Sequence, residues 1–135
     1  MAARGRHGAR RLLVQALYQN QIGGHDADEL ISQFSTSTDF EVIDREYFLT
    51  LLNEILENKA ILESHIATAA DRPVEQLDPV ERGLLWVGTA ELQFHEDAPV
   101  RVIINEAIQL AKEFGAENSY RYINAILDKV AAKLR

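Results

Sequence analysis

Residues 78–94 read DPVERGLLWVGTAELQF and carry the clearest helix signal in the chain. The Asp78 carboxylate can accept hydrogen bonds from the free amides of a first helical turn, and Pro79 is preset for the first helical position. Glu81 can reach back to the backbone of Asp78, as in a capping box. The stretch therefore predicts a helix from Pro79 to about Phe94.

The apolar spacing on both sides of this stretch is also helical. It predicts five more helices. The first ends near residues 23–24, and the other four cover about residues 28–34, 44–70, 98–115 and 117–134. No run of alternating apolar and polar residues reaches the length of a strand. We therefore expect an all-α protein with about six or seven helices in a single compact domain, residues 1–135.

The composition is that of an ordinary globular domain. Apolar residues make up 47% of the 135 residues and charged residues 26%, which argues against a disordered chain. The absence of cysteine excludes disulfides and thiolate ligands and favours the cytoplasm over secretion. No apolar run approaches the roughly 18 residues that cross a bilayer, so we expect no membrane association.

The sequence contains none of the patterns typical of catalysis or metal binding. The four histidines are scattered singly and form no HExxH pair. The seven glycines do not form a phosphate-binding loop, and the serines lack a nucleophile motif. We therefore expect no enzymatic activity, no metal and no cofactor.

The positive charge is concentrated at the N-terminus of a chain whose formal net charge is -7. Arg4, Arg6, Arg10 and Arg11 lie within eleven residues that contain no carboxylate. At the start of a helix, free amides and guanidinium groups together suit phosphate binding. These arginines fit a nucleic-acid site and a solubilising tail equally well.

A second cluster, KEFGAENSYRY at residues 112–122, lies between the last two predicted helices. Single-stranded RNA is typically held by aromatic rings that stack on bases, amides that read base edges and cations that bind phosphates. The stretch supplies all three kinds of group: Lys112, Phe114, Asn118, Tyr120 and Arg121. It therefore favours the nucleic-acid interpretation, although Phe114 also fits the hydrophobic core.

Acidic residues gather along the middle helices and suggest a second kind of partner. They are Glu75, Asp78, Glu81, Glu91, Glu96 and Asp97. Such a face would attract a basic protein and speed its encounter at low salt. A solvated helix surface explains these carboxylates as well.

Three collinear blocks are the most distinctive parts of the sequence: RLLVQALYQ at 11–19, LDPVERGLLWVGTAEL at 77–92 and VIINEAIQLAKEFGAENSYRYINAILDKV at 102–130. Together they resemble the NusB family of bacterial transcription antitermination proteins. The resemblance implies two small helical bundles without catalytic activity. It also implies binding to the boxA element of nascent ribosomal RNA together with NusE, a small-subunit ribosomal protein. The pair helps RNA polymerase, in an antitermination complex, to read through terminators.

The resemblance carries over to two sets of residues. RNA contacts correspond to Arg4, Arg6, Arg10, Arg11, Lys112, Phe114, Asn118, Tyr120 and Arg121. Contacts with NusE correspond to Tyr18, Glu81 and Glu91. The chain departs from the family pattern at Asn118, where an acid is frequent, at Tyr120, where histidine is usual, and at Ala125, where glycine is often found. Some family members self-associate, so the resemblance also allows a homodimer.

Two alternative functions stay open on the sequence. One is a protein-binding helical adaptor without RNA binding, in which the N-terminal arginines are only a tail. The other is the RNA-binding appendage of a ribosomal RNA methyltransferase, although the 135 residues hold no Rossmann-like half for a methyl donor. Salt-sensitive RNA binding distinguishes the adaptor from the nucleic-acid interpretations.

Overall fold

A computed structural model describes the backbone of residues 2–135 and the side chains of residues 5–135. The described residues form seven α-helices and no strand: α1 (Ala2–Gly23), α2 (Ala27–Phe34), α3 (Arg45–Glu57), α4 (Lys59–Ala69), α5 (Pro79–Phe94), α6 (Val100–Phe114) and α7 (Ser119–Leu134). Short 3₁₀ turns at Thr38–Glu41 and Val74–Gln76 precede α3 and α5. The predicted all-α class is confirmed.

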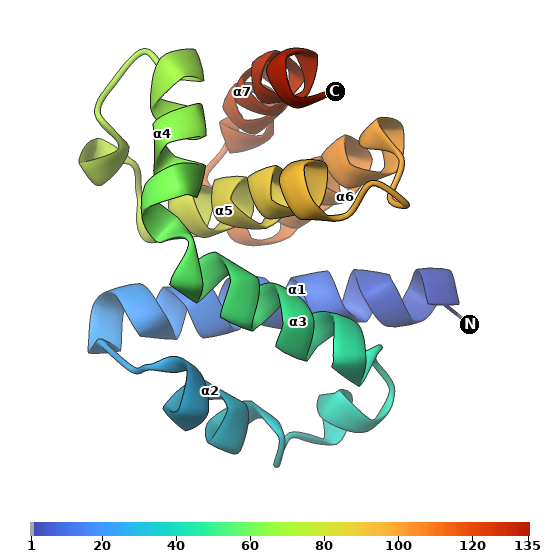
Figure 1. Ribbon diagram of the computed structural model, residues 1–135. Helices are drawn as coiled ribbons and strands as arrows, with labels where there is room; N and C mark the ends of the chain where they lie inside the picture. Colours follow the sequence, from blue (N-terminus) through green and yellow to red (C-terminus); the bar gives the residue numbers. More distant parts are fainter. Residues whose placement is uncertain (1) are drawn as a thin grey trace.

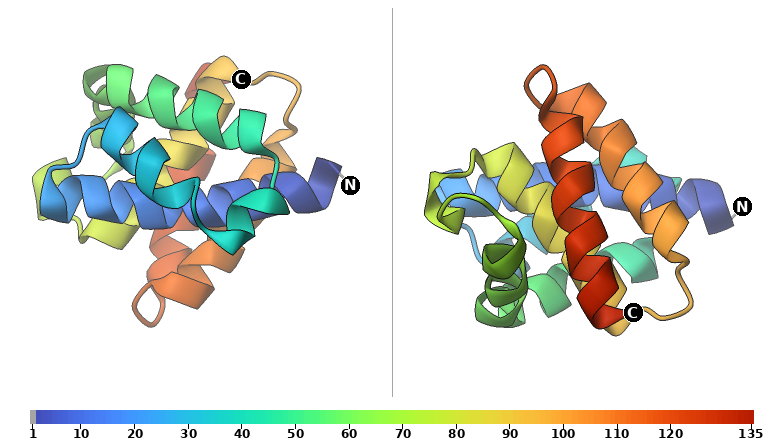
Figure 2. Two further views of the ribbon diagram at one scale, coloured as in Figure 1. Left: turned by 90° about the horizontal axis from the view of Figure 1, so that it is seen from below. Right: turned by 90° about the horizontal axis from the view of Figure 1, so that it is seen from above.

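The helices form two groups, as the family resemblance implies (Figure 1). Helices α1, α2 and α3 make one bundle, and α4 to α7 make the other. Helix α5 is central, because it packs against α1 and α3 of the first bundle as well as α4, α6 and α7 of its own. Two further views show the N-terminal half of α1 passing beside α6 (Figure 2).

Helix α5 begins as its sequence predicts. The Asp78 carboxylate accepts a hydrogen bond of 2.9 Å from the Glu81 amide, and Pro79 occupies the first turn. Residues 83–92 are all buried, because α5 is covered on every side. At Gly88 a Cβ atom would lie 2.8 Å from Leu127 Cδ1, so the glycine lets α7 approach closely.

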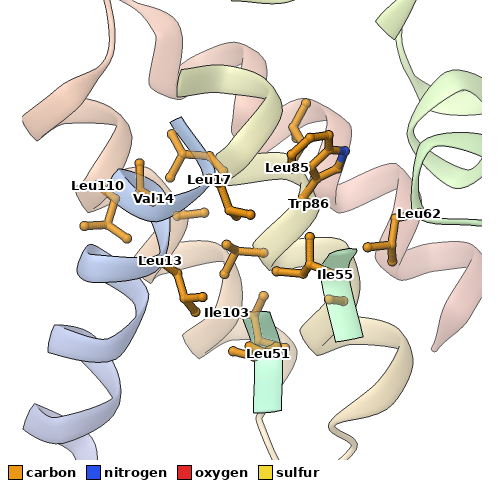
Figure 3. Packing of buried hydrophobic residues seen from close by; sticks show 14 of the residues in the cluster. Leu13, Val14, Leu17, Leu51, Ile55, Leu62, Leu85, Trp86, Ile103 and Leu110 are labelled. Atoms are coloured by element: carbon orange, nitrogen blue, oxygen red, sulfur yellow. The ribbon is translucent and has the colours of Figure 1, made fainter. Parts of the chain in front are cut away.

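Leucine, isoleucine and tryptophan side chains from both bundles meet around α5 (Figure 3). Leu13 and Leu17 come from α1, Leu51 from α3, and Leu85 and Trp86 from α5 itself. Each such buried side chain contributes roughly 1.5–3 kcal/mol of transfer free energy. One continuous core therefore holds the two bundles together.

The single helix predicted for residues 44–70 is wrong, because the chain breaks at Asn58. The Asn58 Nδ2 donates a 2.8 Å hydrogen bond to the carbonyl of Glu54, and its backbone amide bonds to Ile55 instead of continuing the helical pattern. Such local bonds compete with the helix. The break lets the chain leave the first bundle as α3 and enter the second as α4 (Figure 1).

No helix in the described part of the chain is long and apolar enough to span a membrane.

Candidate nucleic-acid interface

Arg10 lies inside the fold, where it forms a paired ionic contact with Glu91. Its Nε and Nη2 atoms donate hydrogen bonds of 2.8 and 2.7 Å to the two carboxylate oxygens, and Nη1 donates to Glu106 at 3.2 Å. The Tyr47 hydroxyl donates a further hydrogen bond to Glu91. Arg10 is 3% exposed and Glu91 is 1% exposed. The structure therefore buries two residues that the sequence places on binding surfaces.

This burial corrects both assignments for a physical reason. Two parallel N–H donors match one carboxylate, which makes the arginine–glutamate pair a strong and specific contact. Burial by itself lowers the pKa of Arg10, but the hydrogen bonds and charge of Glu91 outweigh it and raise the pKa above its usual value. Burial also raises the pKa of Tyr47, and Glu91 raises it further, so the hydroxyl stays a donor. Arg10 and Glu91 fasten α1 to α5.

Arg6 and Arg11 are paired as well, but nearer the surface. Arg6 Nη2 lies 3.1 Å from Asp97 Oδ2, and its guanidinium stands 4.2 Å from the centre of the Tyr47 ring. Arg11 Nε donates to Glu113 Oε2 at 2.7 Å, and Nη2 forms an ion pair with the same oxygen at 2.6 Å. The hydrogen bond with Glu113 raises the pKa of Arg11. The side chain of Arg4 lies outside the described residues.

Apart from Glu91 in α5, the partners of residues 6–11 follow one another along residues 97–113 in the same order. Asp97 pairs with Arg6, Glu106 with His7 and Arg10, and Glu113 with Arg11. This order agrees with the N-terminal half of α1 crossing beside α6 (Figure 2). The acid-free N-terminal stretch therefore receives its counter-charges from residues about a hundred positions away.

Sequence reasoning missed three residues of this network, Tyr47, Glu106 and Glu113, and placed Asp97 only on an acidic face for a basic partner. One signal was available, because Glu106 and Glu113 are seven residues apart and so lie on one face of α6. A basic N-terminal helix and an acidic helix face suggest pairing, but nothing in the spacing says which helices meet. Tyr47 offered no comparable signal in the sequence.

The turn between α6 and α7 presents cations of a different kind. Lys112 Nζ lies 4.7 Å from the centre of the Tyr120 ring, and the Arg121 guanidinium lies 5.7 Å from it. Arg121 Nε also donates to the Tyr120 hydroxyl at 3.2 Å, a contact that lowers the pKa of Tyr120. Lys112 and Arg121 are exposed, and within residues 5–135 neither forms a salt bridge.

Asn118 is the residue that precedes α7, and its backbone is left-handed, with φ of 68°. Asparagine tolerates this conformation better than most residues. Its side chain makes no capping hydrogen bond and is exposed, so the amide is open to a ligand. The structure thus brings Lys112, Tyr120 and Arg121 together, with Asn118 at the start of the same helix. We call these four residues the turn cluster.

Phe114 lies beside α1, where it contacts Arg11 instead of the turn cluster. Its ring centre is 5.2 Å from the Arg11 guanidinium. Phe114 also lines a groove of about 430 Å³ together with Tyr18, which is 44% exposed. The other residues lining this groove are Val14, Gln15, Gln19, Gln33, Phe34 and Val80. One predicted RNA residue and one predicted NusE residue therefore share a groove.

Glu81 lies close to the same region, at the start of α5. Its carboxylate accepts a 2.8 Å hydrogen bond from the hydroxyl of Ser119, the first residue of α7. The predicted reach of Glu81 back to Asp78 is therefore replaced by a contact with α7. Glu81 adjoins Val80 of the groove and Ser119 of the turn. Two of the predicted partner residues, Tyr18 and Glu81, therefore lie on the same side of the molecule as the turn cluster, whereas the third, Glu91, is buried.

Within the described residues, no three His, Asp or Glu side chains are grouped so that they could hold a metal ion.

Comparison with known proteins identifies relatives over almost the whole chain. The model of the NusB family matches residues 7–132. The transcription antitermination protein NusB of Alcanivorax borkumensis is 45% identical over 130 residues, which cover 96% of this chain and 87% of the relative. The protein of the same name from Burkholderia cenocepacia is 40% identical over 135 residues, 100% of this chain and 93% of the relative.

Two solved structures have the same fold. NusB of T. maritima aligns with a TM-score of 0.85 and 28% identity, over 95% of this chain and 91% of that chain. A NusB in complex with NusE and double-stranded RNA aligns with a TM-score of 0.83, over 96% of this chain and 98% of that chain. The second structure is 21% identical, so it supports the fold alone.

Proposed function

This chain belongs to the NusB family, and from that premise we propose that it binds the boxA element of nascent ribosomal RNA together with NusE. Its relatives are transcription antitermination proteins, and the chain is such a factor and not an enzyme. In this proposal, residues 1–135 act as one RNA-binding unit of the antitermination complex of RNA polymerase, in the cytoplasm. A NusB that aligns with this chain has been solved with NusE and RNA.

The turn cluster is the observation that carries the RNA part of the proposal. Tyr120 offers a ring for base stacking, and Lys112 and Arg121 on either side of it have no carboxylate partner within residues 5–135. A stacking residue flanked by free cations is a common way to hold single-stranded RNA. We therefore assign the main RNA contacts to Lys112, Asn118, Tyr120 and Arg121, with Arg11 at the edge.

The neighbouring groove and Glu81 support the NusE part. Tyr18 supplies an exposed aromatic ring in a groove lined by apolar and glutamine side chains, and Glu81 supplies a charge that attracts a basic ribosomal protein. Because this surface adjoins the turn cluster, one RNA segment can contact both proteins. A homodimer remains a prediction, which analytical ultracentrifugation of the free protein tests.

Labelled boxA RNA, titrated with the protein alone and with the NusE complex, tests the proposal. We expect binding that is tighter with NusE and that weakens with salt, with a log-log slope of about -0.7 for each phosphate contact. A scrambled RNA of the same length is the control. NusE binding with no RNA binding in either form would support the helical adaptor instead.

Reversing the charge of Glu81 is expected to weaken NusE binding. We expect Glu81→Lys to lower the affinity roughly fivefold, because it places a cation opposite a basic partner. Isothermal titration calorimetry with purified NusE measures the change. Ser119→Ala is the matched control, because it removes the same hydrogen bond and leaves the Glu81 charge in place. Equal losses in both variants would mean that Glu81 only fastens α5 to α7.

A further inference from the structure

The ion pair of Arg11 and Glu113 lies in solvent between α1 and α6. Arg11 Nε donates a hydrogen bond of 2.7 Å to Glu113 Oε2, and Nη2 lies 2.6 Å from the same oxygen. The two side chains are 41% and 40% exposed, in contrast to the buried pair of Arg10 and Glu91. Lys112, a member of the turn cluster, is the residue next to Glu113. This pair therefore lies where α1 meets the proposed RNA surface.

We propose that Glu113 competes with RNA phosphate for Arg11, as an autoinhibitory contact built into the surface. A carboxylate and a phosphate use the same N–H donors of a guanidinium, in the same planar geometry. RNA that reaches Arg11 takes over the Nε and Nη2 donors and releases Glu113 into water. The inference rests on the proposed RNA binding and adds the residue that limits it.

The exchange is physically accessible at Arg11 because exposed ion pairs are weak. Their stabilisation is small in water and falls further with salt, so a phosphate group can replace the carboxylate at little cost. The buried Arg10 has no such freedom, because its partners Glu91 and Glu106 enclose it. An incoming phosphate cannot reach that guanidinium without opening the core.

Arg6 is the other described N-terminal arginine with a surface pair, and its surroundings disfavour phosphate. It lines a cleft of about 310 Å³ together with Tyr47, Asp44 and Glu46. Those two carboxylates repel a polyanion. Arg11 also lies near a second carboxylate, Asp39, which helps to raise its pKa, but its immediate surroundings include the Phe114 ring, 5.2 Å from its guanidinium, and the exposed Lys112, which precedes Glu113 in α6. Arg11 is therefore the arginine at which exchange is expected.

The ion pair of Arg11 and Glu113 makes RNA affinity depend on the path that the RNA backbone takes. An RNA that binds the turn cluster but places no phosphate at Arg11 gains nothing from the arginine and is repelled by Glu113. An RNA whose backbone continues towards α1 displaces Glu113 and gains a charged contact. The pair thereby favours RNA that follows one path across the surface, on a protein whose net negative charge already opposes indiscriminate binding.

A double-mutant cycle on Arg11 and Glu113 tests the competition. The wild type, E113Q, R11Q and R11Q/E113Q are titrated with labelled boxA RNA as NusE complexes, at low and at high salt. We expect E113Q to raise the affinity about three- to tenfold at low salt, by removing one nearby charge and freeing one guanidinium. In the R11Q background, E113Q should raise the affinity for boxA RNA by less than about twofold.

The matched control is E117Q, which removes an exposed carboxylate from the same turn. Glu117 forms no ion pair in the part of the chain with described side chains. The effect of E117Q should be smaller than that of E113Q and independent of Arg11. Thermal unfolding of each variant checks that the fold is unchanged.

Equal gains from E113Q with and without Arg11 would overturn the competition and leave only general charge repulsion. No gain from E113Q would also overturn it, because Arg11 would then make no contact with RNA. If the wild-type complex itself fails to bind boxA RNA, the proposed function fails, independently of Glu113.

Discussion

Arg10→Met is expected to lower the free energy of unfolding by about 3–5 kcal/mol, because it leaves the buried Glu91 carboxylate without its cation. Arg10 supplies two of the hydrogen bonds that Glu91 accepts, at 2.8 and 2.7 Å, and Tyr47 alone cannot replace them. The guanidinium also bonds to Glu106, so α1 loses contacts with both α5 and α6. Urea denaturation followed by circular dichroism measures the loss.

Arg6→Met is the matched control, since it removes a cation from the same helix but from an exposed pair. Its effect on stability should stay below about 1 kcal/mol. The double variant R10M/E91M should recover part of the stability, because two apolar side chains replace both charges together. If R10M were as stable as R6M but bound RNA poorly, Arg10 would be the surface contact that the N-terminal charge pattern predicts.

Tyr120→Ala is expected to weaken RNA binding by the NusE complex about 10- to 100-fold, equivalent to roughly 1–3 kcal/mol for one lost stacking contact. The ring lies beside both free cations of the turn, so its removal also releases Lys112 and Arg121 from their positions. Tyr120→Phe should keep most of the affinity, because stacking needs the ring and not the hydroxyl. Fluorescence anisotropy with labelled boxA RNA measures both variants.

Tyr122→Ala provides the matched control for Tyr120→Ala. Like Tyr120, Tyr122 is a half-buried residue of α7. The Arg72 guanidinium lies 4.4 Å from the centre of the Tyr122 ring. Its hydroxyl donates to Asp71, so its surroundings are less favourable for RNA. We expect little change in RNA affinity. Equal losses in the two variants would show that α7 packing, and not base stacking, supports RNA binding.

Local signals predicted most of the helices. The cap formed by Asp78 and Pro79 marked the start of α5, and the apolar spacing with Gly115 marked the extent of α6. These features act within a few residues and are therefore readable from a short stretch. The break at Asn58 was missed because one asparagine inside an apolar stripe is a weak signal. Its effect depends on the packing of α4 against α5 and α7.

For the binding residues, too, local features were predictable from the sequence and long-range contacts were not. The turn cluster was predictable because Lys112, Tyr120 and Arg121 are close in sequence and are brought together by one turn. The burial of Arg10 and its pairing with Glu91 were not predictable from neighbouring residues, because Glu91 lies 81 residues away. An acid-free stretch appears unpaired until the fold brings distant carboxylates to it. Long-range ion pairs therefore decide which arginines are free for RNA.

We propose that RNA binds at the turn cluster and not at the buried Arg10. The salt dependence of boxA RNA binding by the NusE complex tests it directly, with K112Q/R121Q compared with K129Q/K133Q. Lys129 and Lys133 are exposed on the C-terminal half of α7, so the second variant removes the same charge elsewhere.

We predict that K112Q/R121Q weakens binding and reduces the log-log salt slope by about 1.4, the contribution of two phosphate contacts on a single strand. K129Q/K133Q should leave the slope unchanged. An unchanged slope in K112Q/R121Q, or equal reductions in both variants, would contradict the assignment of the RNA site to the turn between α6 and α7.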